Sequence, residues 1–242
     1  MHYFASTDST NQQALDAIQR GGVPHGSVFF ADAQSAGRGT AGNRWESPPG
    51  EGLWFSVVLV DPPQPLAFAP AIAIVDVCRR ECGIDAHAKW PNDVLVENRK
   101  LAGVLIESTE RDGQRQWVVG VGLNVLQREF PTSLGATSLW CETQRAWDRV
   151  EVYCRVLRRL GEALSERDLI AAWRARCRMF GSRVTAEKRS RDGVRQGVVE
   201  LLGLDVHGHL RVRWDDGDEE VVIAASEWDL GRHPVGHQKP AP

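Results

Sequence analysis

The stretch LWFSVVLV, from Leu53 to Val60, constrains the fold most strongly. It is apolar and rich in β-branched residues, and polar and apolar positions hardly alternate along it. Such a run is typical of a strand that is buried on both faces of a sheet. A strand of this kind needs packing layers on both sides. The 242 residues are enough for one large domain of that type plus a small appendage.

The surrounding patterns predict a mixture of helices and strands. Ser9 and Gln12 resemble a capping box, in which the serine accepts from a first-turn N–H while the glutamine reaches back, so we expect a helix there that ends at Gly21 and Gly22. Further helices are expected over 70–82, 147–164 and 168–179, and strands over 27–31, 53–60, 94–96, 100–107 and 117–124.

The composition changes after Gly181. Short runs of period-two alternation follow, clearest from Leu210 to Trp214, and Asp216-Gly217 is a hairpin signal. We therefore expect a large α+β domain over residues 1–180 and a small β-barrel-like domain over residues 181–232. The tail, residues 233–242, contains His237 and is expected to fray.

Charge and cysteine content argue against several classes of protein. The 29 basic and 32 acidic residues give a net charge of −3, which is not the electrostatic footprint of a nucleic-acid partner. The first residues, MHYFASTDSTNQQ, have neither a basic segment nor an apolar h-region, and no later run is long enough to span a bilayer. We expect a cytoplasmic protein without a membrane partner. The five cysteines lack CxxC spacing, so neither a protein-bound metal nor a disulfide framework is expected.

Three stretches have the composition of a binding site. The first is QSAGRGTAGNRW, from Gln34 to Trp45. Its glycines allow close approach of the backbone to a ligand, so that Arg38 can be aimed from a loop whose N–H groups also face the site. A flexible surface loop is the alternative for a GRG sequence alone, but such a loop has no need of Trp45.

The second stretch is KWPND, from Lys89 to Asp93. Pro91 restricts Trp90 to extended geometry, and alternation then points Lys89 to the opposite face. The short polar side chains after the proline can fix the strand end. We therefore predict that Lys89 is held on a rigid element, the alternative being an ordinary solvated lysine.

The third stretch is VGVGLN, from Val119 to Asn124. Glycines inside a strand often mark the place where a flat ligand or another backbone comes close, although a bulge is the alternative.

Taken in order, STN, AGRGxxGxxW, KWPND, RKLAGVLIE, GVGLN and the small β module closely resemble the biotin protein ligase family, from Ser9 to about Leu230. The resemblance implies a mixed-sheet catalytic domain of the biotin/lipoate ligase type with an SH3-like β-barrel C-terminal domain. It also implies a two-step reaction. Biotin and ATP, with Mg²⁺, give biotinyl-5'-AMP, and the biotinyl group then passes to a lysine of the biotin carrier domain of a biotin-dependent carboxylase.

The resemblance also implies roles for individual residues, with Lys89 and Arg38 as the catalytic pair. A carboxylate and a phosphate about 4 Å apart repel each other by roughly 4 kcal/mol at an effective dielectric near 20, and a fixed cation between them reverses that sign. The implied biotin-binding residues are Ser9, Thr10, Asn11, Gln34, Arg38, Gly39, Lys89, Gly103, Gly120 and Gly122. The implied adenylate-binding residues are Arg38, Thr40, Arg44, Trp45, Lys89 and Asn124, with the adenine under 126–140.

The chain departs from the family pattern in its glycine-rich loop. The family commonly has GRGRxGR, whereas Thr40 and Asn43 occupy the second and third arginine positions here. We therefore expect faster release of biotinyl-5'-AMP than in an arginine-bearing relative, unless Arg44 compensates. The ligand-binding helix begins at Ser9, so we also expect the short form of the family, without an N-terminal DNA-binding domain.

Two other functions remain open at this point. Lipoate or octanoate attachment would also use a placed lysine, but a plain acyl chain does not need the polar groups of Ser9, Thr10 and Gln34. A non-catalytic biotin sensor would keep those groups and have no use for Lys89. Exposed edge strands can pair in a homodimer or dock the carrier domain, and the sequence does not decide between them.

Overall fold

The computed structural model describes residues 1–190, 193–223 and 225–234 of the chain. It divides into two compact units, Met1–Arg176 and Cys177–Pro242, close to the boundary expected at residues 180 and 181. Residues 235–242 of the expected tail, including His237, lie outside the described residues.

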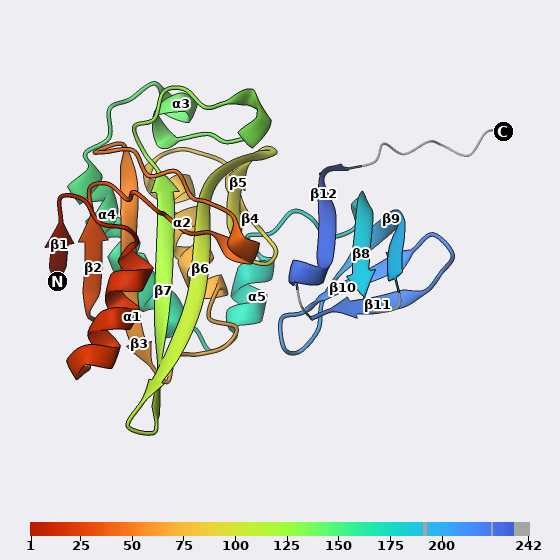
Figure 1. The fold of residues 1–242 in the computed structure, drawn as a ribbon. Helices are drawn as coiled ribbons and strands as arrows, with labels where there is room; N and C mark the ends of the chain where they lie inside the picture. Colours follow the sequence, from red (N-terminus) through yellow and green to blue (C-terminus); the bar gives the residue numbers. More distant parts are fainter. Residues whose placement is uncertain (191–192, 224, 235–242) are drawn as a thin grey trace. The chain divides into compact units, whose positions relative to one another are not determined.

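The first unit is built on a seven-stranded mixed sheet, in the order β1-β2-β3-β7-β6-β5-β4 (Figure 1). β1 and β2 are parallel, and the other neighbouring strands are antiparallel. The mixed-sheet α+β architecture expected from the sequence is confirmed. The strands are β1 (His2–Phe4), β2 (Val28–Ala31), β3 (Gly52–Val60), β4 (Ala86–Lys89), β5 (Asp93–Val96), β6 (Arg99–Arg111) and β7 (Gln114–Asn124).

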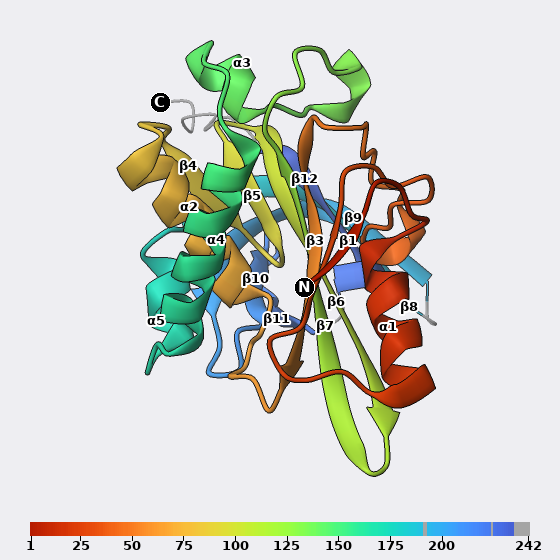
Figure 2. The ribbon, with the colours of Figure 1, turned by 90° about the vertical axis from the view of Figure 1, so that its left-hand side faces the viewer.

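Helices cover both faces of this sheet (Figure 2). α1 (Thr10–Gly21) lies on one face, and α2 (Phe68–Glu81), α4 (Arg149–Leu164) and α5 (Leu169–Arg174) lie on the other. β3 is therefore buried over nearly its whole length, as its apolar run predicted. Short α3 (Leu139–Thr143) follows β7. Within the described residues, no helix combines the length and the apolar character that crossing a membrane requires.

The fourth long helix is shorter than the sequence indicated. It was expected over 168–179, but α5 ends at Arg174. Just beyond it, the Arg176 carbonyl accepts a hydrogen bond of 2.9 Å from the Ala88 N–H of β4, and the Arg176 guanidinium bonds both oxygens of Asp76. The chain leaves the helix because these contacts tie residue 176 to the sheet and to α2.

The predicted capping box at the start of α1 is wrong, whereas the predicted helix is confirmed. Ser9 is the N-cap residue, but within the described residues 1–190 its side chain makes no capping hydrogen bond. The first-turn Thr10 N–H instead donates to Gln34 Oε1 at 2.8 Å, and Gln12 Nε2 donates to Asp16 Oδ1 at 2.7 Å. A residue distant in sequence therefore caps the helix.

The second unit is a five-stranded antiparallel sheet, in the order β11-β10-β9-β8-β12. Its β10–β11 turn contains Gly217 at φ +97°, at the expected hairpin position. Alternate residues of β10 are buried, including Leu210, Val212 and Trp214, so the small β module is confirmed. The strands are β8 (Arg183–Ser190), β9 (Gly193–Leu204), β10 (Leu210–Trp214), β11 (Glu219–Val222) and β12 (Trp228–Pro234).

Candidate functional site

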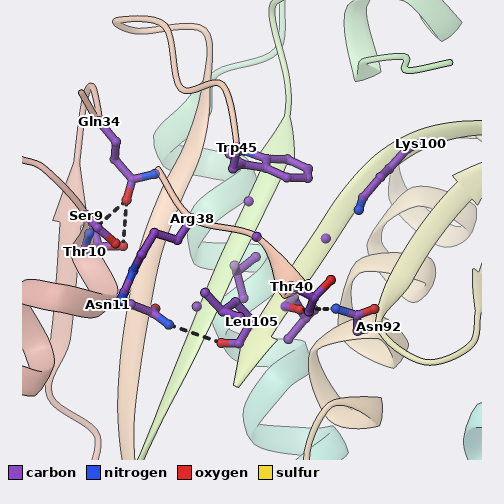
Figure 3. A pocket seen from close by; sticks show the side chains of 16 residues that line it. Ser9, Thr10, Asn11, Gln34, Arg38, Thr40, Trp45, Asn92, Lys100 and Leu105 are labelled. Carbon is purple, nitrogen blue, oxygen red and sulfur yellow. Dashed lines mark hydrogen bonds between the residues drawn. The ribbon is translucent and has the colours of Figure 1, made fainter. Parts of the chain in front are cut away.

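A cavity lies over the middle of the first unit's sheet, between β6 and β7, the N-terminus of α1 and the glycine-rich loop 34–47 (Figure 3). It encloses about 40 Å³. It is lined by Ser9, Thr10, Asn11, Gln34, Arg38, Gly39, Thr40, Trp45, Asn92, Lys100, Gly103, Val104, Leu105, Gly120, Val121 and Gly122.

Three glycines form the floor of this cavity. Gly103 of β6 and Gly122 of β7 are directly paired, and the Trp45 ring lies against both. A Cβ at Gly122 would lie 2.5 Å from Trp45 Cε2, and one at Gly120 would lie 2.2 Å from Asn11 Oδ1. The groups close to the β7 glycines are side chains of this protein, which a Cβ at either position would displace, so the predicted approach of a flat ligand stays a prediction.

One end of the cavity carries a fixed set of polar groups. Gln34 Oε1 accepts from the Thr10 N–H at 2.8 Å and from Thr10 Oγ1 at 3.2 Å, while Gln34 Nε2 donates to Ser47 Oγ at 2.8 Å. The Ser56 hydroxyl lies 2.7 Å from Thr10 Oγ1 and 2.6 Å from Asn11 Oδ1. Gln34 is partly buried, the other four residues are buried, and all hold one another, so they present donors and acceptors in fixed directions.

The acidic residue before this polar end stabilises the start of α1. Gln13 Nε2 and the Ser9 N–H donate to the Asp8 carboxylate at 3.0 and 2.6 Å. These bonds favour the charged form and hold the pKa of Asp8 below its ordinary value. A negative charge at a helix N-terminus is also favourable for the helix dipole.

The glycine-rich loop folds back on itself and places Arg38 in the cavity. The Trp45 N–H donates to the Gly37 carbonyl at 2.9 Å. Arg38 Nη2 lies 2.8 Å from Glu107 Oε2, and the same carboxylate oxygen accepts from Asn11 Nδ2 at 2.8 Å. Arg38 is therefore brought to the site from a folded loop, as predicted.

The lysine in the cavity is Lys100, whereas the sequence indicated Lys89. Lys89 ends β4, the edge strand of the sheet, and it is not one of the described residues that line the cavity. Lys100 Nζ lies 2.6 Å from Asp93 Oδ1 and 5.2 Å from the centre of the Trp45 ring. Cross-strand pairing of Lys89 with Asp93 and of Asp93 with Gly103 puts Lys89 on the face of the sheet that carries the cavity, so its role in the site stays a prediction.

The KWPND motif supports the strand that carries Lys100. Asn92 Nδ2 donates to the Val104 carbonyl at 2.5 Å, and the Val104 N–H donates to the Asn92 carbonyl at 3.0 Å. With the Asp93–Lys100 pair, these bonds join the motif to β6 at two points. Its rigidity serves the lysine of the neighbouring strand.

Two other predicted site residues make their contacts outside the cavity. Arg44 is exposed and donates to the Ser35 carbonyl at 3.0 Å. The buried Asn124 side chain donates to the Thr137 carbonyl at 2.9 Å and accepts from Gln127 at 3.2 Å, so it supports the segment after β7. Neither lines the cavity. The lining residues that sequence reasoning missed are Asn92, Lys100, Val104, Leu105 and Val121.

Comparison with known proteins identifies the family of the chain. The model of the Biotin/lipoate A/B protein ligase family matches residues 3–124. The chain is 33% identical over 239 residues to a biotin--[acetyl-CoA-carboxylase] ligase from Mycobacterium tuberculosis, covering 92% of this chain and 86% of the relative. It is 32% identical over 249 residues to one from Paracoccus denitrificans, covering 94% and 99%. The structure of Aquifex aeolicus biotin protein ligase in complex with biotin and ATP superimposes with a TM-score of 0.78 and 29% identity, covering 96% of this chain and 98% of that one. The chain therefore belongs to the biotin/lipoate A/B protein ligase family.

Proposed function

We propose that this protein is an ATP-dependent ligase that adenylates biotin and transfers it to a lysine in the biotin carrier domain of a carboxylase. The observation that carries this proposal is the convergence of Arg38 and Lys100 on one cavity whose other end holds fixed polar groups. The related ligases named for acetyl-CoA carboxylase support the acceptor, and the Aquifex complex supports biotin and ATP as the substrates.

The first step needs cations between two anions. A biotin carboxylate oxygen attacks the α-phosphorus of ATP, the bond to the bridging oxygen breaks, and pyrophosphate leaves as the mixed anhydride forms. Lys100 and Arg38 are the cations of the cavity, so we assign them the neutralisation of charge on the phosphoryl oxygens. Lys100 thus takes the role that the sequence indicated for Lys89.

In the second step the neutral amine of the carrier lysine attacks the carbonyl carbon of the adenylate. The C–O bond to AMP breaks, an amide bond forms, and the amine loses a proton. No further energy source is required, because the anhydride was made at the cost of ATP. The acceptor is therefore a protein with an accessible lysine, and we infer a carboxylase carrier domain.

The polar end of the cavity favours a ureido ring over a plain acyl chain. Thr10 and Gln34 already fix each other in direction, so the N–H groups and lone pairs that they do not use on each other are oriented toward a polar head group, and a plain acyl chain would cover them without a partner. This argues against lipoate or octanoate as the substrate. A sensor without catalysis has no use for Lys100 and Arg38 together.

Binding requires the Trp45 ring to move. The enclosed 40 Å³ is far below the roughly 300 Å³ or more of a ligand pocket, and the ring lies on the glycine floor. Withdrawal of the indole would expose the floor formed by Gly103 and Gly122 to a flat ligand.

Several finer points remain predictions. We infer that Mg²⁺ enters bound to the ATP phosphates, where it would offset charge on the departing pyrophosphate. We also infer that adenine binds under residues 126–140. We infer further that edge strands pair in a homodimer. The metal is tested by the dependence of the exchange reaction on Mg²⁺. The homodimer is tested by sedimentation, and the expected cytoplasmic location by cell fractionation.

The test is incubation with ATP, Mg²⁺, biotin and a carrier domain, read by intact mass and by biotin-dependent pyrophosphate exchange. The native chain should add one biotinyl group to the carrier. Lys100→Ala should slow exchange on the order of 100-fold, whereas Lys89→Ala, a matched change outside the cavity, should retain most activity. No exchange by the native chain would reject the function, and a larger loss in K89A than in K100A would reject the assignment of the lysine.

A further inference from the structure

The carboxylate of Glu107 is the point at which the glycine-rich loop meets the sheet. Its Oε2 accepts from Arg38 Nη2 and from Asn11 Nδ2, both at 2.8 Å. Asn11 is 3% exposed, and its Oδ1 lies 2.6 Å from the hydroxyl of fully buried Ser56. A continuous series of hydrogen bonds therefore runs from the core strand β3 through α1 and β6 to Arg38.

Glu107 uses one part of the guanidinium and leaves the rest available. Arg38 Nε is buried, and none of the described residues places an acceptor within hydrogen-bonding distance of it. A guanidinium is planar, so fixing Nη2 also sets the direction of its other N–H groups. Arg38 lines the cavity (Figure 3), so these groups are held where an anionic oxygen of a ligand can accept from them.

Net charge gives the cavity little attraction for anions, because each of its two cations has its own carboxylate. Arg38 is paired with Glu107, and Lys100 is paired with Asp93. From a distance the two pairs are close to neutral, so their contribution to catalysis depends on where each positive group points.

We propose that Glu107 is a positioning residue for the adenylation step and acts by orienting Arg38. The inference rests on the proposed ligase function. A guanidinium released from Glu107 could follow the loop outward, and a displacement of about 1 Å can cost on the order of 100-fold in rate. The chemical class of the ligand group is an anionic oxygen, either of a carboxylate or of a phosphate.

Two substitutions separate orientation from charge. Both donors share one carboxylate oxygen, so Glu107→Gln keeps an acceptor for Arg38 and Asn11 while losing the charge. Glu107→Ala removes the acceptor. In biotin-dependent pyrophosphate exchange, kcat should fall on the order of 10- to 100-fold in E107A and stay near native in E107Q. Glu110→Ala, an exposed change on the same strand, is the control and should match the native chain.

A double variant shows whether Glu107 acts through the arginine. In an Arg38→Ala background, E107A should cause no further loss of kcat, because the group that it positions is already gone. A loss as large as in the native background would overturn the proposal, and so would native kcat in E107A.

A second readout does not depend on activity. Trypsin cleavage after Arg38, followed by peptide mass, should be several-fold faster in E107A than in the native chain and unchanged in E110A. Unchanged cleavage in E107A would mean that the carboxylate does not hold the loop. Absence of exchange by the native chain would reject the ligase function, while faster cleavage in E107A would still support the contact between Glu107 and Arg38.

Discussion

Lys100 Nζ lies 2.6 Å from the carboxylate of Asp93, so the last residue of the KWPND motif holds the cation of the next strand. Both side chains are partly buried, at 30% and 22% exposed. Asn92 secures the same strand through the Val104 backbone. The motif and Lys100 are therefore joined, and Asn92 of the motif lines the cavity together with Lys100.

Loss of the Asp93 charge should reduce catalysis more than binding. In Asp93→Asn the ammonium loses its ion-pair partner and is less restricted, so kcat for adenylation should fall on the order of 10-fold while the KM for biotin changes less. Steady-state pyrophosphate exchange measures both. Asp112→Asn is the matched control, because Asp112 is 86% exposed at the β6–β7 turn. A KM effect without a kcat effect in D93N would contradict the prediction.

A methyl group on the glycine floor should block the ligand. In Gly122→Ala the new Cβ would lie 2.5 Å from the Trp45 ring, on the surface that a flat ligand must use. The Kd for biotin, measured by isothermal titration, and the KM, measured by exchange kinetics, should both rise on the order of 10-fold or more.

Gly161→Ala is the control for the glycine change. A Cβ at Gly161 of α4 meets no described atom outside its own helix backbone and chain neighbours within 4 Å, and an alanine should favour that helix. Biotin affinity equal to native in G122A, with an unchanged melting temperature, would show that the ligand does not lie on this floor.

Thr40 and Asn43 occupy the positions of two arginines in the family pattern. Introducing arginine at each position should affect the release of biotinyl-5'-AMP differently. Thr40 lines the cavity, whereas Asn43 is exposed and donates its side-chain amide to the Thr40 carbonyl. Thr40→Arg should therefore slow release of biotinyl-5'-AMP, and Asn43→Arg should leave the off-rate near native. Stopped-flow displacement measures both rates. Equal off-rates in T40R and the native chain would reject the expectation that this loop retains the adenylate weakly.

The position of Lys100 shows where sequence reasoning reached its limit. Lys100 and Gly103 are three positions apart, so regular alternation would put them on opposite faces of β6. The pairing of β6 with β5 shifts register between Val94 and Leu95, whose partners are Ala102 and Lys100, and this bulge brings Lys100 to the face of Gly103. The sequence RKLAG contains both residues but not the shift that aligns them.

Other features were predictable because the local sequence determines each of them. The apolar run of β3, the glycines of β7 and the aimed Arg38 depend on local composition, and the structure places them as expected. The cap of α1 was not predictable, because Thr10 donates to Gln34, a residue from another segment. Glu107 was missed for the same reason, since its partners come from α1 and from the loop.

An ion pair away from the cavity joins α2 to the end of the first unit. Arg176 Nε and Nη2 donate to the two oxygens of Asp76 at 2.7 and 2.8 Å. The side chains of Arg176 and Asp76 are 15% and 13% exposed. Burial raises the pKa of Asp76, but the hydrogen bonds and charge of Arg176, together with the charges of Arg80 and Arg159, outweigh it, so the pKa lies below its ordinary value of 3.8.

Removal of the Asp76 charge should destabilise the first unit by about 3 kcal/mol at pH 7, because Asp76→Asn leaves the arginine without its ion-pair partner. The pKa is lower in the folded state, so the stabilisation is present above pH 3.8 and is lost as the pH falls through the folded-state pKa. Urea unfolding is therefore measured from pH 7 to pH 3. The difference in unfolding free energy between the native chain and D76N should become smaller below about pH 4. Asp85→Asn, in an exposed pair at 3.9 Å, should cost less than about 1 kcal/mol. If the difference in unfolding free energy becomes larger in acid, or if D76N and D85N lose equal amounts of it, this pair does not stabilise the unit.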